Sequence, residues 1–148
     1  MLRFLFAAVL SATLIHVGWA QSPSDAAPNL CRSISNADLQ AVLHQTVQGP
    51  QRDPIGTCIW RIAGMNAVTL QPNETGQAGF ENARKRTANT IAVSGIGDDA
   101  FAFVSQAGFV QISFVKHDRF VIVIYEGGTN ATRLDAAKAI ATRVARGL

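Results

Sequence analysis

Three consecutive runs rich in β-branched and aromatic residues constrain the fold of this chain more than any other part of it. They occupy residues 99–104, 109–115 and 120–126, and two short polar links separate them. The middle run alternates with the period of a strand that packs one face against a core. β-Branched and aromatic side chains also favour the pleated surface of a sheet. The three runs therefore predict an antiparallel meander of three strands.

The last of these runs is apolar on both faces. Phe120, Ile122 and Ile124 alternate with Val121 and Val123. A strand with two apolar faces indicates a central position in a sheet that is covered on each side. Because each such side chain contributes roughly 1.5–3 kcal/mol when it is fully buried, we expect the rest of the domain to form around this meander.

A helix is predicted near the start of the domain, ahead of all the predicted strands. Ser35 is a favoured N-cap residue, and Asp38 follows it at the spacing of a capping box. The segment 49–56 comes after this helix and contains Pro50 and Pro54. Two prolines and two glycines within eight residues predict a loop there.

The remaining periodic segments complete the predicted order. They are strands at residues 57–62 and 67–71, a helix at 75–88, a short extended piece around 91–93, and an amphipathic helix that begins at Thr129 or Asn130. The resulting order is helix, hairpin, helix, meander, helix. It is typical of an α+β domain in which helices pack against an antiparallel sheet. We therefore predict a single domain over residues 31–148 with about five strands.

The first twenty residues have the pattern of a secretory signal peptide. Arg3 precedes an apolar run over residues 4–17, and Gly18 and Ala20 supply the small residues of a cleavage site. The run is shorter than the ~20 residues that a membrane span needs, which favours cleavage over anchoring. Residues 21–30 are rich in Pro, Ser and Ala and predict a flexible leader. We expect a periplasmic or secreted protein without a membrane segment in its mature chain.

Two cysteines, Cys31 and Cys58, lie in the expected mature chain. In an oxidising compartment an even pair is most simply one disulfide. The competing interpretations are a redox pair and a metal pair, but the spacing is not Cys-x-x-Cys and only His44 lies near either cysteine. Closing a loop of this length contributes about 3.5 kcal/mol in the chain-entropy model. We predict a structural disulfide that ties the entry of the first helix to the first strand.

The charge of the chain argues against two classes of partner. The formal net charge is +3, and loss of Arg3 with the signal peptide would leave +2. A charge this small does not favour nucleic acid or an anionic membrane as a partner.

One glycine motif matches the dinucleotide fingerprint G-x-G-x-x-A at residues 95–100. That fingerprint needs a helix after the glycines, so that backbone N–H groups meet the pyrophosphate. Here a strand-like run follows, and Asp98 and Asp99 would place two carboxylates against the phosphates. The motif therefore predicts a tight turn, and we expect no bound cofactor.

No group of side chains in the sequence indicates catalysis or metal binding. Asp98 and Asp99 are adjacent in an extended segment, so their carboxylates point to opposite faces. His44 and His117 belong to no metal-ligand spacing, and His117 lies in a predicted hairpin turn. We therefore assign no catalytic, cofactor or metal residue from the sequence.

The pattern as a whole resembles a family of small exported bacterial domains of unknown function, best known from actinobacterial lipoproteins. The resemblance is carried by the exported leader, Leu-Cys before a capped helix, Thr-Cys-Ile-Trp at a strand, Gly-Ile-Gly-Asp-Asp-Ala-Phe before a hairpin, and an Ala-rich last helix. It covers the chain from Cys31 to the end, but the lipid-attachment cysteine is absent. It implies an extracytoplasmic α+β domain with a disulfide, and it transfers no catalytic residue.

These observations lead to three functional hypotheses. The first is an exported, non-enzymatic domain that binds a small ligand or a cell-envelope protein. The alternative is an inhibitor of an exported hydrolase, a protease or lysozyme, acting through the segment 49–56 or the hairpin tip at His117. An enzyme is the third, and it requires a pocket in which His44 or His117 meets Asp98 or Asp99.

Overall fold

The computed structural model describes residues 29–64 and 66–148, which form seven strands, three α-helices and one short 3-10 helix. The strands are β1 (Val47–Arg52), β2 (Cys58–Ile62), β3 (Ala67–Asn73), β4 (Ile91–Val93), β5 (Asp99–Val104), β6 (Val110–Lys116) and β7 (Arg119–Glu126). The helices are η1 (Leu30–Arg32), α1 (Asn36–Leu43), α2 (Gly76–Arg86) and α3 (Asn130–Arg146).

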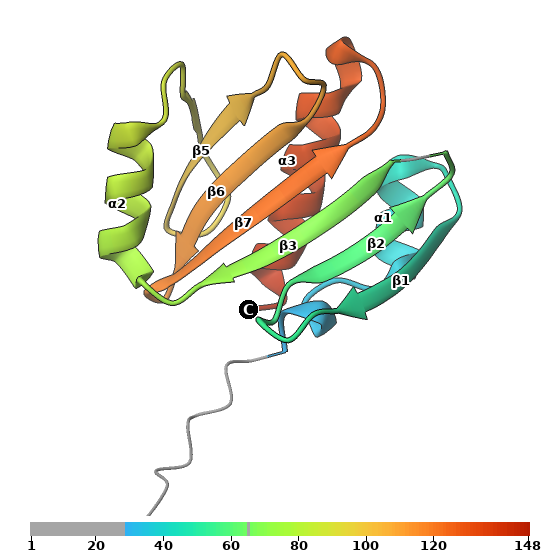
Figure 1. Cartoon of the computed structure of the whole chain (residues 1–148), viewed down its shortest axis with the longest axis horizontal. Coiled ribbons are helices and arrows are strands. Elements are labelled where there is room, and N and C mark those ends of the chain that lie inside the picture. The colour runs from blue at the N-terminus through green and yellow to red at the C-terminus, as the bar shows by residue number, and fades with distance from the viewer. Residues whose placement is uncertain (1–28, 65) are drawn as a thin grey trace, which may run out of the picture.

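All seven strands belong to one antiparallel sheet (Figure 1). Its order is β1-β2-β3-β7-β6-β5-β4, and β7 joins the first hairpin to the meander by pairing with β3. The predicted α+β class, the antiparallel sheet and the β5–β6–β7 meander are confirmed. The predicted strand number of five is wrong, because β1 and β4 add a strand at each edge.

The two additional strands lie where the sequence offers little periodicity. β1 contains Gly49 and Pro50, inside the segment predicted to be a loop. Because β1 is an edge strand, a proline there costs no bond to a second neighbour, and the pairing with β2 is irregular between Gln48 and Gln51. β4 has only three residues and pairs with β5, where the sequence predicts a short extended piece.

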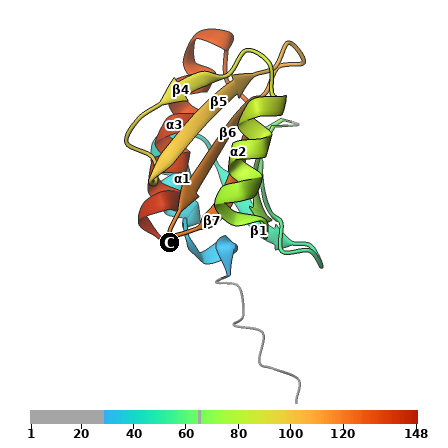
Figure 2. The ribbon, with the colours of Figure 1, turned by 90° about the vertical axis from the view of Figure 1, so that its left-hand side faces the viewer.

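Helices α1 and α3 cover one face of the sheet (Figure 2). The core between these layers is fully buried and includes Leu39 of α1, Trp60 of β2, Ile112 of β6, and Ile140 and Val144 of α3. The α3 residues lie on the apolar face that the sequence predicts for the last helix.

Helix α2 lies on the opposite face, beside β5, β6 and β7 (Figures 1 and 2). Phe80 of α2 packs against Phe101 and Phe120, with ring centroids 5.4 and 5.7 Å apart. The backbone N–H of Gln77 donates to the Asp118 carboxylate at 2.8 Å, so the β6–β7 turn caps the start of α2. Because α2 reaches only this part of the sheet, none of the helices within residues 29–64 and 66–148 covers most of the face over β2 and β3 (Figure 1).

Two local predictions near the start of the domain are confirmed. Ser35 and Asp38 form a capping box, in which each side chain accepts a hydrogen bond from the other residue's backbone N–H at 3.1 Å. Cys31 and Cys58 form a disulfide with their Cα atoms 5.4 Å apart, which links η1 to β2.

The predicted signal peptide, residues 1–20, lies outside the described residues, as do residues 21–28 of the predicted leader. Leu30, which the sequence places at the end of that leader, begins η1 and is buried in the core. Among the described helices, none has the length and apolar character that crossing a membrane requires.

Candidate functional site

The sheet face on the α2 side carries a row of side chains that no helix covers in the part of the chain that the structure describes. The cross-strand register places Ile59 opposite Thr69, Thr69 opposite Ile124, Ile124 opposite Gln111, and Gln111 opposite Phe103. All five side chains are partly exposed. We call these five residues the open-face row. It crosses β2, β3, β7, β6 and β5 in one line.

The composition of the open-face row is unusual for a sheet face that meets water. On a sheet with one face in water, the side chains of that face are normally polar. In this row three of the five side chains, Ile59, Ile124 and Phe103, are apolar, and Thr69 and Gln111 lie between them. Charge is absent from the row. An uncharged, partly aromatic centre is what distinguishes the core of a protein–protein interface from the remaining surface.

Charged side chains lie beside the row and not within it. In the neighbouring register position, Arg61 of β2 and Glu126 of β7 lie on either side of Ala67 of β3. A polar rim around an uncharged centre is the ordinary arrangement of a protein interface. The open-face row and its rim therefore form a surface suited to a folded partner.

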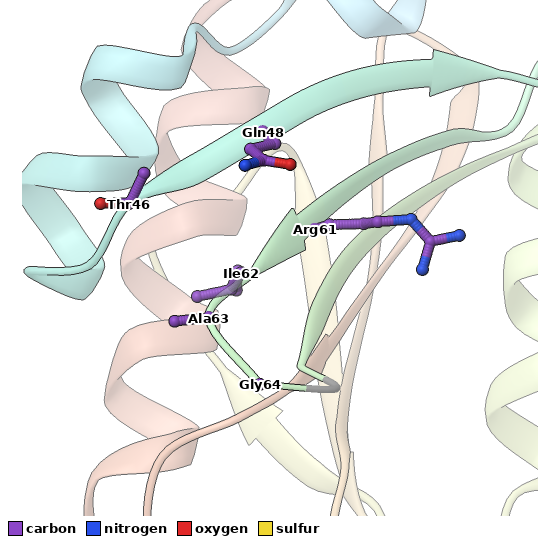
Figure 3. Close-up of a pocket in the computed structure, with 6 residues that line it drawn as sticks. All are labelled: Thr46, Gln48, Arg61, Ile62, Ala63 and Gly64. Carbon is purple, nitrogen blue, oxygen red and sulfur yellow. The ribbon is translucent and has the colours of Figure 1, made fainter.

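A hollow of about 310 Å³ lies at one end of this surface, next to β1 and β2 (Figure 3). Its lining residues are Thr46, Gln48, Arg61, Ile62, Ala63 and Gly64. In Figure 3 the Arg61 side chain extends away from Thr46 and Ala63. The polar side chains of its lining, Thr46, Gln48 and Arg61, do not point toward one another in Figure 3, so the hollow lacks the convergent polar groups of a ligand site.

A second hollow, of about 450 Å³, lies between α2 and the β4–β5 edge. Arg84 Nη2 donates to Asp99 Oδ1 at 2.6 Å, and its guanidinium carbon lies 4.7 Å from the Phe80 ring centroid. This hydrogen bond is the main cause that lowers the pKa of Asp99 and raises the pKa of Arg84. We call the pair the Arg84–Asp99 clamp. It holds α2 to β5, and both groups stay charged at neutral pH.

The acidic and histidine residues that the sequence offers as candidates lie in turns, in the Arg84–Asp99 clamp and at a helix end. Asp98 accepts a hydrogen bond from the backbone N–H of His117 at 2.8 Å, while Asp99 belongs to the clamp. His117 and Asp118 have positive φ and form the two-residue turn between β6 and β7. His44 is the C-cap of α1, which covers the other face.

The two arrangements in question for residues 29–64 and 66–148 are an imidazole–carboxylate pair and a group of metal ligands. Within these residues no imidazole has a hydrogen bond or ion pair to a carboxylate, and no three His, Cys, Asp or Glu side chains gather as metal ligands do. Asp98 meets His117 through the backbone N–H of His117 and not through its imidazole.

The glycine motif at residues 95–100 is a turn that leads into β5. Gly95 and Gly97 both have positive φ. A Cβ atom on Gly97 would lie 2.3 Å from the carbonyl oxygen of Val115, so this position needs glycine. A strand follows the glycines, and the helix N-terminus that a dinucleotide site uses is absent from this turn.

The segment 49–56, which the sequence offers as a possible inhibitory segment, carries an exposed apolar side chain. Ile55 is 81% exposed at the tip of the β1–β2 loop. Asp53 Oδ1 accepts hydrogen bonds from the backbone N–H groups of Ile55 at 3.0 Å and Thr57 at 2.7 Å, and Gly56 N donates to the Asp53 carbonyl at 3.1 Å. The Asp-Pro-Ile-Gly sequence is a turn signal that indicates such an ordered tip.

Comparison with known proteins adds little to this description. No protein-family model matches the chain, and no curated protein matches its sequence. The chain is similar to the crystal structure of a GTP binding regulator from Thermotoga maritima, with 10% sequence identity and a TM-score of 0.44. The alignment covers 78% of this chain and 90% of that chain. We draw no inference about fold or activity from this similarity, and the resemblance to small exported bacterial domains stays a prediction.

Proposed function

We propose that this chain is an exported, non-enzymatic binding module that contacts a protein of the cell envelope through its open sheet face. The observation that carries the proposal is the open-face row, in which five adjacent uncharged side chains lie on a part of the sheet face that none of the described helices covers. Because strands of a packed sheet are already ordered, docking on them costs little conformational entropy. Export is expected from the signal-peptide pattern of the first twenty residues.

A protein partner fits this surface better than a small ligand does. Small-molecule sites are concave and enclose most of their ligand. The hollow beside Thr46 lacks convergent polar groups, and the hollow beside Arg84 contains a guanidinium and a carboxylate that already neutralise each other. An uncharged row with charged side chains along one side instead matches the anatomy of a protein interface.

A charge placed at the centre of the row tests this function. Thr69→Arg introduces a cation between Ile59 and Ile124, and Gln40→Arg places the same charge on the exposed side of α1 as a control. A partner captured from an envelope extract by the wild-type chain is identified, purified and titrated against all three proteins. We expect Thr69→Arg to weaken the Kd at least about tenfold and Gln40→Arg to leave it unchanged.

Two results would contradict this assignment. Equal affinity of the wild-type chain and Thr69→Arg would place the contact elsewhere on the molecule. An extract without a partner, together with thermal stabilisation by a small envelope component, would favour the small-ligand form of the hypothesis.

The Ile55 loop favours a second function, inhibition of an exported protease or lysozyme. An apolar side chain held on an ordered tip is the kind of anchor that fills a pocket on a partner. The hydrogen bond from Gly56 N to the Asp53 carbonyl keeps this backbone bent. Ile55 would therefore obstruct a substrate pocket, because a bent backbone does not present an extended, cleavable segment.

An inhibition assay separates this function from the first. The chain is added to a panel of exported proteases and lysozymes, and the inhibition constant is measured for each. We expect Ile55→Ala to raise the inhibition constant at least about tenfold, with Thr69→Arg unchanged. A panel that the wild-type chain leaves fully active would remove inhibition as a function.

A further inference from the structure

The two edges of the sheet differ in their protection against pairing with another strand. The β1 edge carries Pro50, Arg52 and an irregular register between Gln48 and Gln51. Prolines, charges and bulges are the devices that natural sheets use to prevent edge-to-edge pairing. The β4 edge has the sequence Ile-Ala-Val, with neither a proline nor a charge. Its shortness is the one protecting feature it has.

Two exposed apolar side chains lie beside the β4 edge. Ile91 is 42% exposed and Val104 is 43% exposed. Ile91 is opposite Ala102 in the β4–β5 register, and Val104 is two residues further along β5. Ile91 and Val104 are therefore diagonal neighbours on one face, and Val93, which is partly exposed, lies on the same face. Together they form a separate apolar strip at this edge, on the face opposite to the open-face row.

The charge distribution at this edge fits a second copy of the same chain. Residues 87–97 contain no charged side chain, although the whole chain carries a formal net charge of +3. The basic residues that precede this segment, Lys85 and Arg86, belong to α2, which lies on the other face from Ile91 and Val104. Two copies can therefore meet at β4 without bringing like charges together.

We propose that two copies of this chain pair antiparallel through β4 and join their seven-stranded sheets into one continuous sheet. An antiparallel pairing of a strand with its own copy obeys two-fold symmetry, so each hydrogen bond formed by one copy is repeated by the other. Centred on Ala92, the pairing places Ile91 of each copy opposite Val93 of the other. The apolar contact adds to the few hydrogen bonds that three residues can form.

A pair of matched substitutions tests this dimer. Ile91→Lys adds a cation at the pairing edge of each copy, and Ile55→Lys makes the same change at an exposed isoleucine beside the opposite edge. The molar mass of the purified protein is followed by sedimentation equilibrium as its concentration rises. We expect the wild-type chain and Ile55→Lys to reach twice the monomer mass, and Ile91→Lys to weaken dimerisation at least about tenfold.

A cysteine at the proposed two-fold axis gives a second measurement that does not depend on a strong dimer. Ala92 is exposed, so Ala92→Cys leaves the core unchanged, and the pairing brings its two thiols together. We expect a disulfide-linked dimer from Ala92→Cys in oxidising buffer and far less of it from Ile55→Cys. A wild-type chain that stays monomeric, a dimer that Ile91→Lys leaves intact, or equal cross-linking at both positions would overturn the proposal.

Discussion

At the scale of single residues, Arg84 and Asp99 show how one pair of side chains joins a helix to the sheet. Besides the 2.6 Å hydrogen bond, the guanidinium lies over the rings of Phe80 and Phe101. The side chains of Arg84 and Asp99 are 34% and 42% exposed, so water screens their attraction. Exposed pairs of this kind contribute about 0.2–1 kcal/mol.

The clamp gives the stability of the protein a specific dependence on pH. Its hydrogen bond lowers the pKa of Asp99 in the folded state, so the unfolded chain takes up the proton first as the pH falls. The stabilisation is fully present above the ordinary carboxyl pKa of about 4 and is lost as the pH falls through the lowered value. We expect Asp99→Asn to lower the free energy of unfolding by about 0.5 kcal/mol at neutral pH, and by less in acid.

Urea unfolding of both proteins across an acidic pH series measures this difference. The difference between the wild-type chain and Asp99→Asn should shrink as the pH falls. A difference that stays constant from neutral to acidic pH would show that the charge on Asp99 does not contribute.

At the scale of elements, α2 depends on a residue from another part of the chain. Its own N-cap, Thr75, forms no capping hydrogen bond with its side chain, and the Asp118 carboxylate accepts from Gln77 N instead. Gly76 lies between them, where an added Cβ would be 2.7 Å from Asp118 Oδ1. The start of α2 therefore lies so close to the β6–β7 turn that position 76 needs glycine, and Asp118 supplies the cap.

Removing this cap should loosen α2 without disturbing the turn. Asp118 has a φ of 60°, so Asp118→Gly keeps the backbone conformation while it removes the carboxylate. We expect a loss of about 1 kcal/mol in the free energy of unfolding and faster amide hydrogen exchange in the first turn of α2. Asp118→Asn, which keeps an acceptor oxygen, is the control and should lose less. Unchanged exchange in Asp118→Gly would mean that the hydrogen bond does not stabilise the helix.

The elements that the sequence predicts correctly are those that neighbouring residues specify. The capping box at Ser35 and the alternation within residues 109–115 are local, and both appear in the structure where they are predicted. β1 is different, because Gly49 and Pro50 are turn-forming residues and the segment becomes a strand only by pairing with β2. Local composition therefore predicts a loop where a distant partner imposes a strand.

The open-face row could not be predicted from any one segment. The two apolar faces of β7 predict cover on both sides, but α2 packs on Phe120 and leaves Ile124 partly exposed. Which residues of a strand a helix covers depends on where the helix docks, and periodicity does not contain that information. Predicting the row also requires the register of five strands, because each of its four neighbouring pairs joins two different strands.

At the scale of the whole molecule, the disulfide is the covalent link between the start of the domain and its sheet. Cys31 in η1 and Cys58 in β2 are 27 residues apart in the sequence. We expect the double substitution Cys31→Ala and Cys58→Ala to lower the free energy of unfolding by about 3.5 kcal/mol, because the unfolded chain regains the freedom of the open loop. Denaturant unfolding measures the loss, and the wild-type chain in a thiol reductant is the control. Equal stability of the variant and the oxidised wild-type chain would contradict this estimate of the loop contribution.

The cap that Asp118 gives to α2 also bears on the order in which the molecule assembles. Asp118 is 41 residues beyond Gln77, so during synthesis the helix segment emerges well before the group that completes its first turn. Phe101 and Phe120, on which Phe80 packs, follow it as well. We therefore expect α2 to lack stable structure in the nascent chain until β6 and β7 have formed their hairpin. Pulse-labelled hydrogen exchange during refolding should therefore protect β6 and β7 no later than α2, and earlier protection of α2 would refute this order.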